Sequence, residues 1–209
     1  MRVHILVEGL SEKAFLEMWL PRFLPPQHSF KIIPHRGKGK IPGDPSQKPD
    51  PKRQGLLDQL PAKLRAYGKE LRSDTDRVLV LVDLDHDDCL MLKRRMVNVL
   101  EYCDPPPVVL FRIAIEEIEA FYLGDKSGIR TAFPKCKLSK MDSYTQDSIC
   151  GTWELFKDVI GETSEDKVQW AKLTGTNLST QWKGPSGNSS NSFRQFCKGI
   201  LKLIGEPTD

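Results

Sequence analysis

Three apolar runs in the sequence lead directly into acidic residues, and these acids are the strongest chemical signal in the chain. Carboxylates that lie close together repel one another unless a cation stands between them. Oxygen ligands of this kind suit hard divalent cations such as Mg²⁺ and Mn²⁺. The pattern therefore predicts a metal site at the point where folding brings the acids together. They are Glu8 after residues 3–7, Asp83 and Asp85 after residues 77–82, and Glu116, Glu117 and Glu119 after residues 108–113.

The elements that must position these acids alternate between strands and helices. Short apolar runs predict strands at 3–7, 30–33, 77–82 and 108–113. The stretches between and after them predict helices at 11–20, 56–71 with an irregular first turn or a break at Pro61, 89–101 and 116–123. This alternation predicts an α/β fold with a parallel sheet of about four strands flanked by helices. The acids then meet at the carboxyl ends of the strands, where open parallel sheets bind ligands.

The spacing of the central acids supports a shared ligand. Asp83 and Asp85 are two residues apart, so in extended backbone both side chains point to the same side. Gly9, which follows the first strand and its acid, lets the backbone approach a ligand closely. An exposed acid-rich loop is the alternative for this segment, and Asp87 or Asp88 is expected to cap the next helix.

The last third of the sequence differs from the rest because it shows no clear strand. Helices are predicted at 153–160, 166–173 and 193–203, with a polar loop at 184–192. We therefore predict a domain over residues 1–125 that carries the acids, and a mostly helical extension over residues 126–209 packed on it.

Charge is unevenly distributed along the chain, whose formal net charge is +3. Between Arg36 and Arg77 there are 11 Lys or Arg residues and 6 Asp or Glu residues. A basic segment is typical of proteins with a polyanionic partner. The alternative is a solvated helix face with a mobile loop, because residues 36–54 are rich in Gly and Pro. The candidate contacts to nucleic acid are Arg36, Lys38, Lys40, Lys52 and Arg53.

Composition excludes several other classes of protein. Of the 209 residues, 39% are hydrophobic, which is enough for an independent core. No apolar run approaches the roughly 18 residues of a membrane span, so no membrane partner is expected. The five cysteines are scattered without zinc-like spacing. With no signal-peptide pattern at the first residues, we expect a reduced, cytoplasmic protein.

Two motifs in this order and spacing resemble the Toprim domain, the metal-binding module of topoisomerases, bacterial primases and nucleases of the overcoming-lysogenisation-defect type. They are ILVEGLSE at 5–12 and VLVLVDLDHDD at 78–88. The chain is most similar to a branch of small Toprim-like proteins encoded beside an ATPase and associated with phage defence. Segments similar to that branch are RIAIEEIEAFYLGD at 112–125 and SNSFRQF at 190–196.

The resemblance implies a role for each matching acid. Glu8 matches the Toprim glutamate, which acts as general acid/base or metal ligand. Asp83 and Asp85 match the pair that holds the metal, and Glu117 and Glu119 match an acidic pair that completes a second metal position. The sequence departs from the branch at Phe121, where the branch has tryptophan, and in a longer loop at 184–192.

These observations together predict a Mg²⁺- or Mn²⁺-dependent nuclease that hydrolyses phosphodiester bonds in DNA or RNA, working with an ATPase in phage defence. A non-catalytic Toprim-like partner that regulates an ATPase is one alternative. A haloacid-dehalogenase-type phosphatase, which also uses strand-Asp-x-Asp, is the other. That family carries Thr or Val two residues after the second Asp, and here Asp87 occupies the position.

Overall fold

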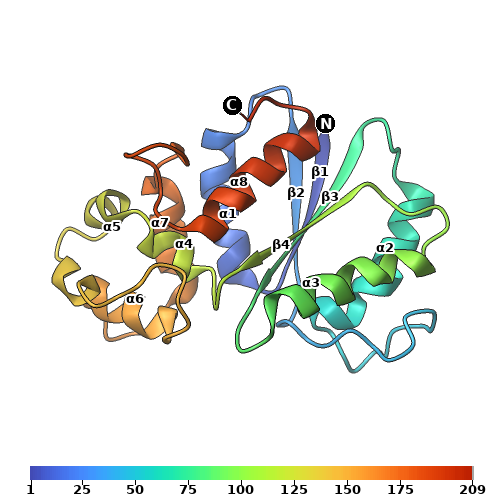
Figure 1. Cartoon of the computed structure of the whole chain (residues 1–209), viewed down its shortest axis with the longest axis horizontal. Coiled ribbons are helices and arrows are strands. Elements are labelled where there is room, and N and C mark those ends of the chain that lie inside the picture. The colour runs from blue at the N-terminus through green and yellow to red at the C-terminus, as the bar shows by residue number, and fades with distance from the viewer. Residues whose placement is uncertain (209) are drawn as a thin grey trace.

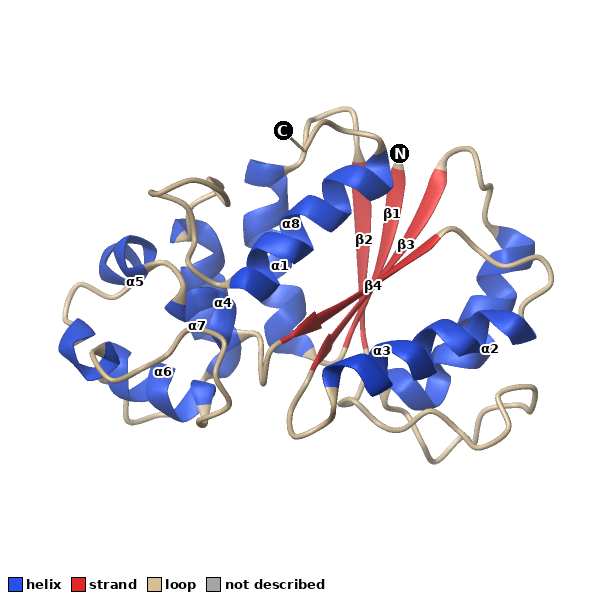
Figure 2. Cartoon of the chain, in the orientation of Figure 1, coloured by secondary structure: helices blue, strands red, loops and turns tan. Residues whose placement is uncertain are grey.

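Four parallel strands form the centre of the protein, in the computed structural model that describes residues 1–208. Their order across the sheet is β2-β1-β3-β4. All strands are parallel, and helices lie on both faces (Figures 1 and 2). The predicted α/β class and four-stranded parallel sheet are therefore confirmed. The strands span Arg2–Val7 (β1), Ser29–Pro34 (β2), Asp76–Asp83 (β3) and Val109–Ala114 (β4).

The two central strands are apolar on both sides, which is why they lie inside the sheet. In β3, Leu79 and Leu81 belong to one core while Val78, Val80 and Val82 belong to the other. Side chains of a strand alternate between its faces, so one continuous apolar run supplies both cores.

Each face of the sheet is covered by its own helices (Figure 2). On one face lie α1 (Leu10–Phe23) and α8 (Asn191–Ile204), joined through the ring contact of Trp19 with Phe193. On the other lie α2 (Leu56–Glu70) and α3 (Cys89–Asn98), which is followed by a 3-10 turn at Val99–Tyr102.

The remaining helices form a lobe beside the sheet and share its core (Figure 1). They are α4 (Glu119–Leu123), α5 (Lys126–Ala132), α6 (Thr152–Ile160) and α7 (Lys167–Asn177), with a 3-10 turn at Leu138–Met141. The α7 helix lies so close to α1 that a Cβ on Gly175 would come 2.5 Å from the Phe15 carbonyl oxygen. The predicted extension is therefore continuous with the core of the sheet, through α7 and α8.

Two local predictions from the sequence are wrong. The α2 helix continues through Pro61, which is buried, without a break. The helix predicted at 116–123 begins only at Glu119, because Glu116 adopts a left-handed backbone with φ of 60°. The α5 helix was not predicted. Among residues 1–208, no helix is long and apolar enough to cross a membrane.

Candidate functional site

The carboxyl ends of β1 and β3 meet at Glu8 and Asp83. Because the two strands are parallel neighbours, their carboxyl ends lie at the same edge of the sheet. The Glu8 Oε1 atom accepts a hydrogen bond from the Asp83 backbone N–H at 2.8 Å. The sequence prediction that these two acids share one place is therefore consistent with the geometry.

Asp83 has other carboxyl groups close to it. Its Oδ1 atom is inaccessible and has no hydrogen-bond partner within the described residues. Burial, together with the carboxylates of Glu8, Glu12 and Glu119, raises the pKa of Asp83 well above its usual range. Burial likewise raises the pKa of Glu8 to about 8, although Lys38 and the Asp83 backbone N–H oppose the change. These carboxyl groups hold protons, or need a cation, near neutral pH.

Glu12, in the first turn of α1, belongs to the same cluster but was not predicted from the sequence. It is 6% exposed; its Oε1 accepts from the Ser11 hydroxyl at 2.9 Å, and its Oε2 has no partner in the described part of the chain. A Cβ on Gly9 would lie 3.1 Å from that Oε2, so the glycine leaves room for the carboxylate. The signal in the sequence was the acid four residues after Glu8.

Tyr122 is a second residue of this cluster that was not predicted from the sequence. Its hydroxyl is buried, and residues 1–208 supply no hydrogen-bond partner for it. Burial raises the pKa of Tyr122, and the charges of Glu119, Glu12 and Asp83 raise it further. The hydroxyl therefore stays neutral, within the electrostatic influence of these carboxylates. We call Glu8, Glu12, Asp83, Glu119 and Tyr122 the carboxylate centre.

The Asp85 carboxylate is more exposed than that of Asp83, whose Oδ1 atom is buried. The strand ends at Asp83, and Asp85 takes a left-handed backbone with φ of 49°, so the extended geometry expected from the sequence is absent. Its side chain is about half exposed and lies 3.0 Å from the Lys38 Nζ, which is also 2.7 Å from Asp87. Asp85 still lies near enough to Glu8 to raise its pKa.

The two glutamates predicted to complete a metal position point to different places. Glu119 is buried at the start of α4, and burial raises its pKa to about 7. The Glu117 Oε2 atom accepts from the Trp153 backbone N–H at 3.1 Å and from the Thr152 hydroxyl at 3.4 Å. Glu119 therefore belongs to the carboxylate centre, and Glu117 lies between the centre and α6.

Glu116 binds the start of α6 more completely. Its carboxylate accepts from the backbone N–H groups of Cys150, Gly151 and Thr152 at 2.7–3.1 Å. Burial alone would raise the pKa of Glu116, but these three donors outweigh it and lower the pKa. Such a carboxylate satisfies free N–H groups at a helix start and complements the helix dipole.

Lys38 differs from the other candidate nucleic-acid contacts because it faces inward. Only 13% of its side chain is exposed, and its Nζ also donates to the Leu84 carbonyl oxygen at 2.9 Å. The remaining four candidates are exposed on the segment between β2 and α2; they are Arg36, Lys40, Lys52 and Arg53.

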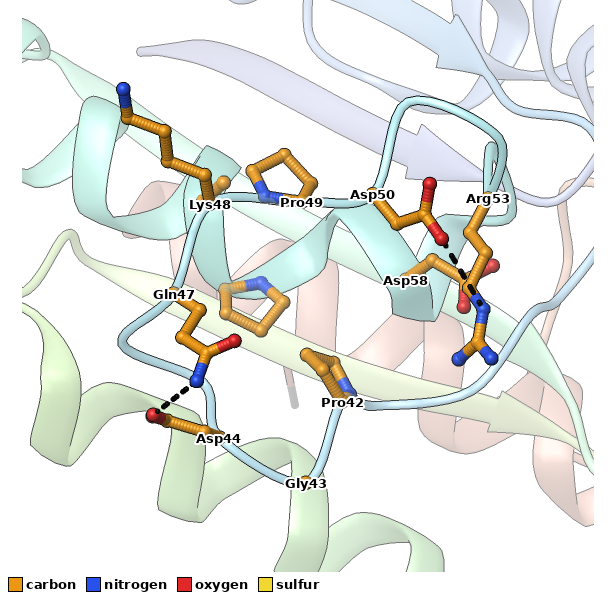
Figure 3. Close-up of a pocket in the computed structure, with 11 residues that line it drawn as sticks. Pro42, Gly43, Asp44, Gln47, Lys48, Pro49, Asp50, Arg53 and Asp58 are labelled. Carbon is orange, nitrogen blue, oxygen red and sulfur yellow. Dashed lines mark hydrogen bonds and ion pairs between the residues drawn. The ribbon is translucent and has the colours of Figure 1, made fainter.

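This segment is folded back on α2. Arg65 donates to the carbonyl oxygens of Pro45 and Gln47. A pocket of about 260 Å³ lies between the loop and α2, and Arg53 reaches across to Asp50 at its rim (Figure 3). The basic loop therefore has a defined shape, with its cations on the outside.

The carboxylate centre fits a hard divalent cation by chemistry. Its donors are oxygens, and two of them, Asp83 Oδ1 and Glu12 Oε2, are buried without partners in the described chain. Within residues 1–208, no three or more His, Cys, Asp or Glu side chains are already arranged to hold a metal. Binding would therefore require the carboxylates to reorient toward the cation.

A parallel α/β sheet with acids gathered at its carboxyl edge defines a class of proteins with a ligand site at that edge. The chain belongs to the family described as domain of unknown function DUF4276, whose profile matches residues 7–200. The match includes every member of the carboxylate centre. No curated protein and no solved structure matches the chain.

Proposed function

We propose that the protein is a Mg²⁺- or Mn²⁺-dependent nuclease of Toprim-like type that hydrolyses phosphodiester bonds in DNA or RNA. The observation that carries the proposal is the meeting of Glu8 and Asp83 in a largely buried cluster, in which two carboxylate oxygens, of Asp83 and Glu12, are buried without partners in the described chain. Buried like charges are unfavourable without a compensating cation. The adjacency of β1 and β3 also agrees with the Toprim resemblance, which requires these two strand ends to meet.

Within this proposal, Glu8, Asp83, Glu12 and Glu119 would hold the cation. A bound divalent cation supplies neutralisation of phosphate charge and activation of water. Glu8, whose pKa is raised to about 8, is placed to accept or return a proton near neutral pH. The Tyr122 hydroxyl is buried without a hydrogen-bond partner in the described chain, and the raised pKa keeps it neutral.

The exposed cations of the basic loop would position the substrate backbone. Arg36, Lys40, Lys52 and Arg53 lie on the segment that leaves β2, next to β1 and its Glu8. Contacts of this kind track phosphates without reading sequence. Lys38 instead fixes Asp85 and Asp87, so its role is to position the loop that follows β3.

The proposal is tested by cleavage of labelled DNA and RNA oligonucleotides with Mg²⁺ or Mn²⁺. Glu8→Gln and Asp83→Asn should each lower the rate by about a hundredfold or more, because a catalytic metal contributes several kcal/mol. Asp74→Asn is the matched control, since Asp74 is an exposed acid before β3, at the amino end of the sheet. Cleavage that survives both centre substitutions would contradict the proposal.

The ion pairs of Lys38 favour one alternative, a non-catalytic partner that regulates an ATPase. Lys38 already neutralises Asp85 and Asp87 without a metal. On this alternative the chain would cleave nothing, with or without the ATPase, and would instead change the rate of ATP hydrolysis. Measuring both rates with purified proteins separates the two functions.

A further inference from the structure

Trp153, in the first turn of α6, carries two lysine ammonium groups against its ring. The Lys167 Nζ lies 4.3 Å from the ring centroid, and the Lys157 Nζ lies 5.6 Å from it. Part of the indole packs on the core, so the residue is only partly exposed. An aromatic ring with adjacent cations is the chemistry that binds a nucleobase together with its phosphate.

Trp153 and Lys167 both contact Glu117, which lies between the carboxylate centre and α6. The Trp153 backbone N–H is held by Glu117, and the Lys167 Nζ lies 3.8 Å from the other oxygen of the same carboxylate. The charge of Lys167 also reaches the centre, where it lowers the pKa of Glu119. Trp153 and Lys167 therefore adjoin Glu117, and the charge of Lys167 is felt at Glu119 of the carboxylate centre.

The present partners of the two lysines are weak enough to be exchanged. Lys167 is 37% exposed and its contact to Glu117 is long, while Lys157 lies 3.2 Å from an exposed Glu165. Surface ion pairs and exposed cation–π contacts each contribute little. A phosphate could therefore attract Lys167 away from the indole and leave the ring face for a base.

Exposed apolar side chains surround the same edge of the sheet. Leu10 follows β1 and is 61% exposed, and Leu90 follows β3 and is 80% exposed. Ile149, which is 52% exposed, precedes the three N–H groups that bind Glu116 after β4. Paired bases hide their faces inside a duplex, whereas unpaired bases present apolar faces that such side chains can contact.

We propose that Trp153 and Lys167 form a nucleotide-binding platform beside the carboxylate centre, and that the substrate is single-stranded nucleic acid. This inference rests on the proposed nuclease function, for which it names the substrate class. A base stacks on the indole while Lys167 contacts its phosphate, and the adjoining nucleotide reaches the carboxylate centre. Stacking tolerates every base, so the platform selects strandedness rather than sequence.

The test measures binding of the full-length protein to a fluorescein-labelled dT20 strand and to a 20-base-pair duplex, in EDTA so that no cleavage occurs. Trp153→Leu should weaken binding of the single strand about tenfold. Trp153→Phe should restore most of that loss. Lys167→Met should flatten the salt dependence of log K by about 0.7. Trp182→Leu and Lys172→Met are the matched controls, since Trp182 also carries a lysine near its ring and Lys172 is exposed on the same α7.

A second measurement separates this inference from the proposed function. Hydrolysis of bis(4-nitrophenyl) phosphate by the wild-type protein with Mn²⁺ tests the nuclease chemistry by itself, without a nucleic-acid strand to bind. If wild-type protein hydrolyses no diester but loses single-strand binding in Trp153→Leu, the nuclease proposal fails and the binding platform stands. If the wild type does not bind the single strand, or prefers the duplex, the platform is refuted.

Unchanged binding in both Trp153→Leu and Lys167→Met would also refute the platform, whatever the cleavage assay shows. Circular dichroism checks that each variant is folded. Should Trp153→Leu unfold, the salt slope of Lys167→Met still decides the question, because that lysine is partly exposed and its loss leaves the core intact.

Discussion

The Nζ atom of Lys38 lies 2.7 Å from Asp87 and 3.0 Å from Asp85, so a single ammonium group connects the loop after β2 to the loop after β3. The same loop is joined to the end of β1, because the Gly37 backbone N–H donates to the Glu8 carbonyl oxygen at 2.9 Å. Three strand ends are thus held together around the carboxylate centre. Lys38 is part of the framework of the site rather than of its outer surface.

Replacing Lys38 by Met should destabilise the fold by roughly 1–2 kcal/mol at pH 7, because two carboxylates lose a largely buried partner. The expected loss of stability is this small because Asp85 and Asp87 are each about half exposed, so that water screens their charges. Lys40→Met, two residues away and exposed, should change the free energy of unfolding by less than about 0.5 kcal/mol. Urea denaturation of both variants checks the difference, and equal values would contradict the structural role of Lys38.

Divalent cations should stabilise the folded protein through the carboxylate centre. A ligand that binds only the folded state raises the melting temperature. Glu8→Gln keeps the oxygen that accepts from the Asp83 N–H but is neutral without binding a proton, so it should raise the metal-free stability near pH 7 by roughly 1–3 kcal/mol. The same variant should lose most of the Mg²⁺ or Mn²⁺ response in differential scanning calorimetry. A full response in Glu8→Gln would place the cation elsewhere.

The metal-free protein should become less stable as the pH rises from about 5 to 8. Burial raises the pKa of Glu8 to about 8 and that of Glu119 to about 7, both above the ordinary value of 4.5. The folded state therefore binds protons more tightly than the unfolded state, and that advantage is lost as the pH rises through the folded pKa values. Urea midpoints at unit pH steps should fall over this window, and 10 mM Mg²⁺ should reduce the fall. A flat profile without metal would show that these groups are not desolvated.

The exposed cations of the basic loop should affect nucleic-acid binding and not folding. Replacing Arg36, Lys40, Lys52 and Arg53 by Ala should reduce affinity at low salt. Each lost phosphate contact flattens the salt dependence of log K by about 0.9 for duplex DNA or 0.7 for a single strand. The melting temperature should stay within error because all four side chains are exposed. Binding that appears only with a co-encoded ATPase would assign the loop to protein docking instead.

Glu116 should contribute strongly to stability, although it lies outside the carboxylate centre. Glu116→Ala removes the acceptor for three backbone N–H groups at the start of α6 and should cost roughly 2–3 kcal/mol. Glu116→Gln retains an acceptor oxygen and should cost less. Thermal unfolding of both variants, followed by circular dichroism, checks the order. An alanine variant as stable as the wild type would mean that water replaces the carboxylate without penalty.

The sheet and the meeting of Glu8 with Asp83 could be predicted because apolar runs and the parallel-strand rule are local and general. The positions of Lys38 and Glu117 could not be predicted from the sequence. A Gly- and Pro-rich basic segment resembles a solvated loop, and only the fold shows that Lys38 bonds with residues more than 45 positions away. Glu117 turns toward α6 because its partners lie 35 and 36 residues further along the chain.

Glu12 and Tyr122 were missed for a related reason. Each looks ordinary in its own helix, as a first-turn acid and as an aromatic residue of a short amphipathic segment. Their significance comes from buried oxygens left without partners within residues 1–208, which depends on how α1 and α4 pack at the end of the sheet. The spacing of Glu12 four residues after Glu8 does not by itself report that packing, and Tyr122 has no such spacing signal.

The contact between Trp19 of α1 and Phe193 of α8, whose ring centroids are 5.2 Å apart, has a consequence for biosynthesis. Phe193 is translated 174 residues after Trp19, which takes roughly 10–35 s at ordinary elongation rates. During that interval the apolar side of α1 and β1 lacks the helix that covers it. The nascent chain therefore exposes an apolar surface until α8 emerges from the ribosome. We expect its dependence on ribosome-associated chaperones to increase as translation becomes slower.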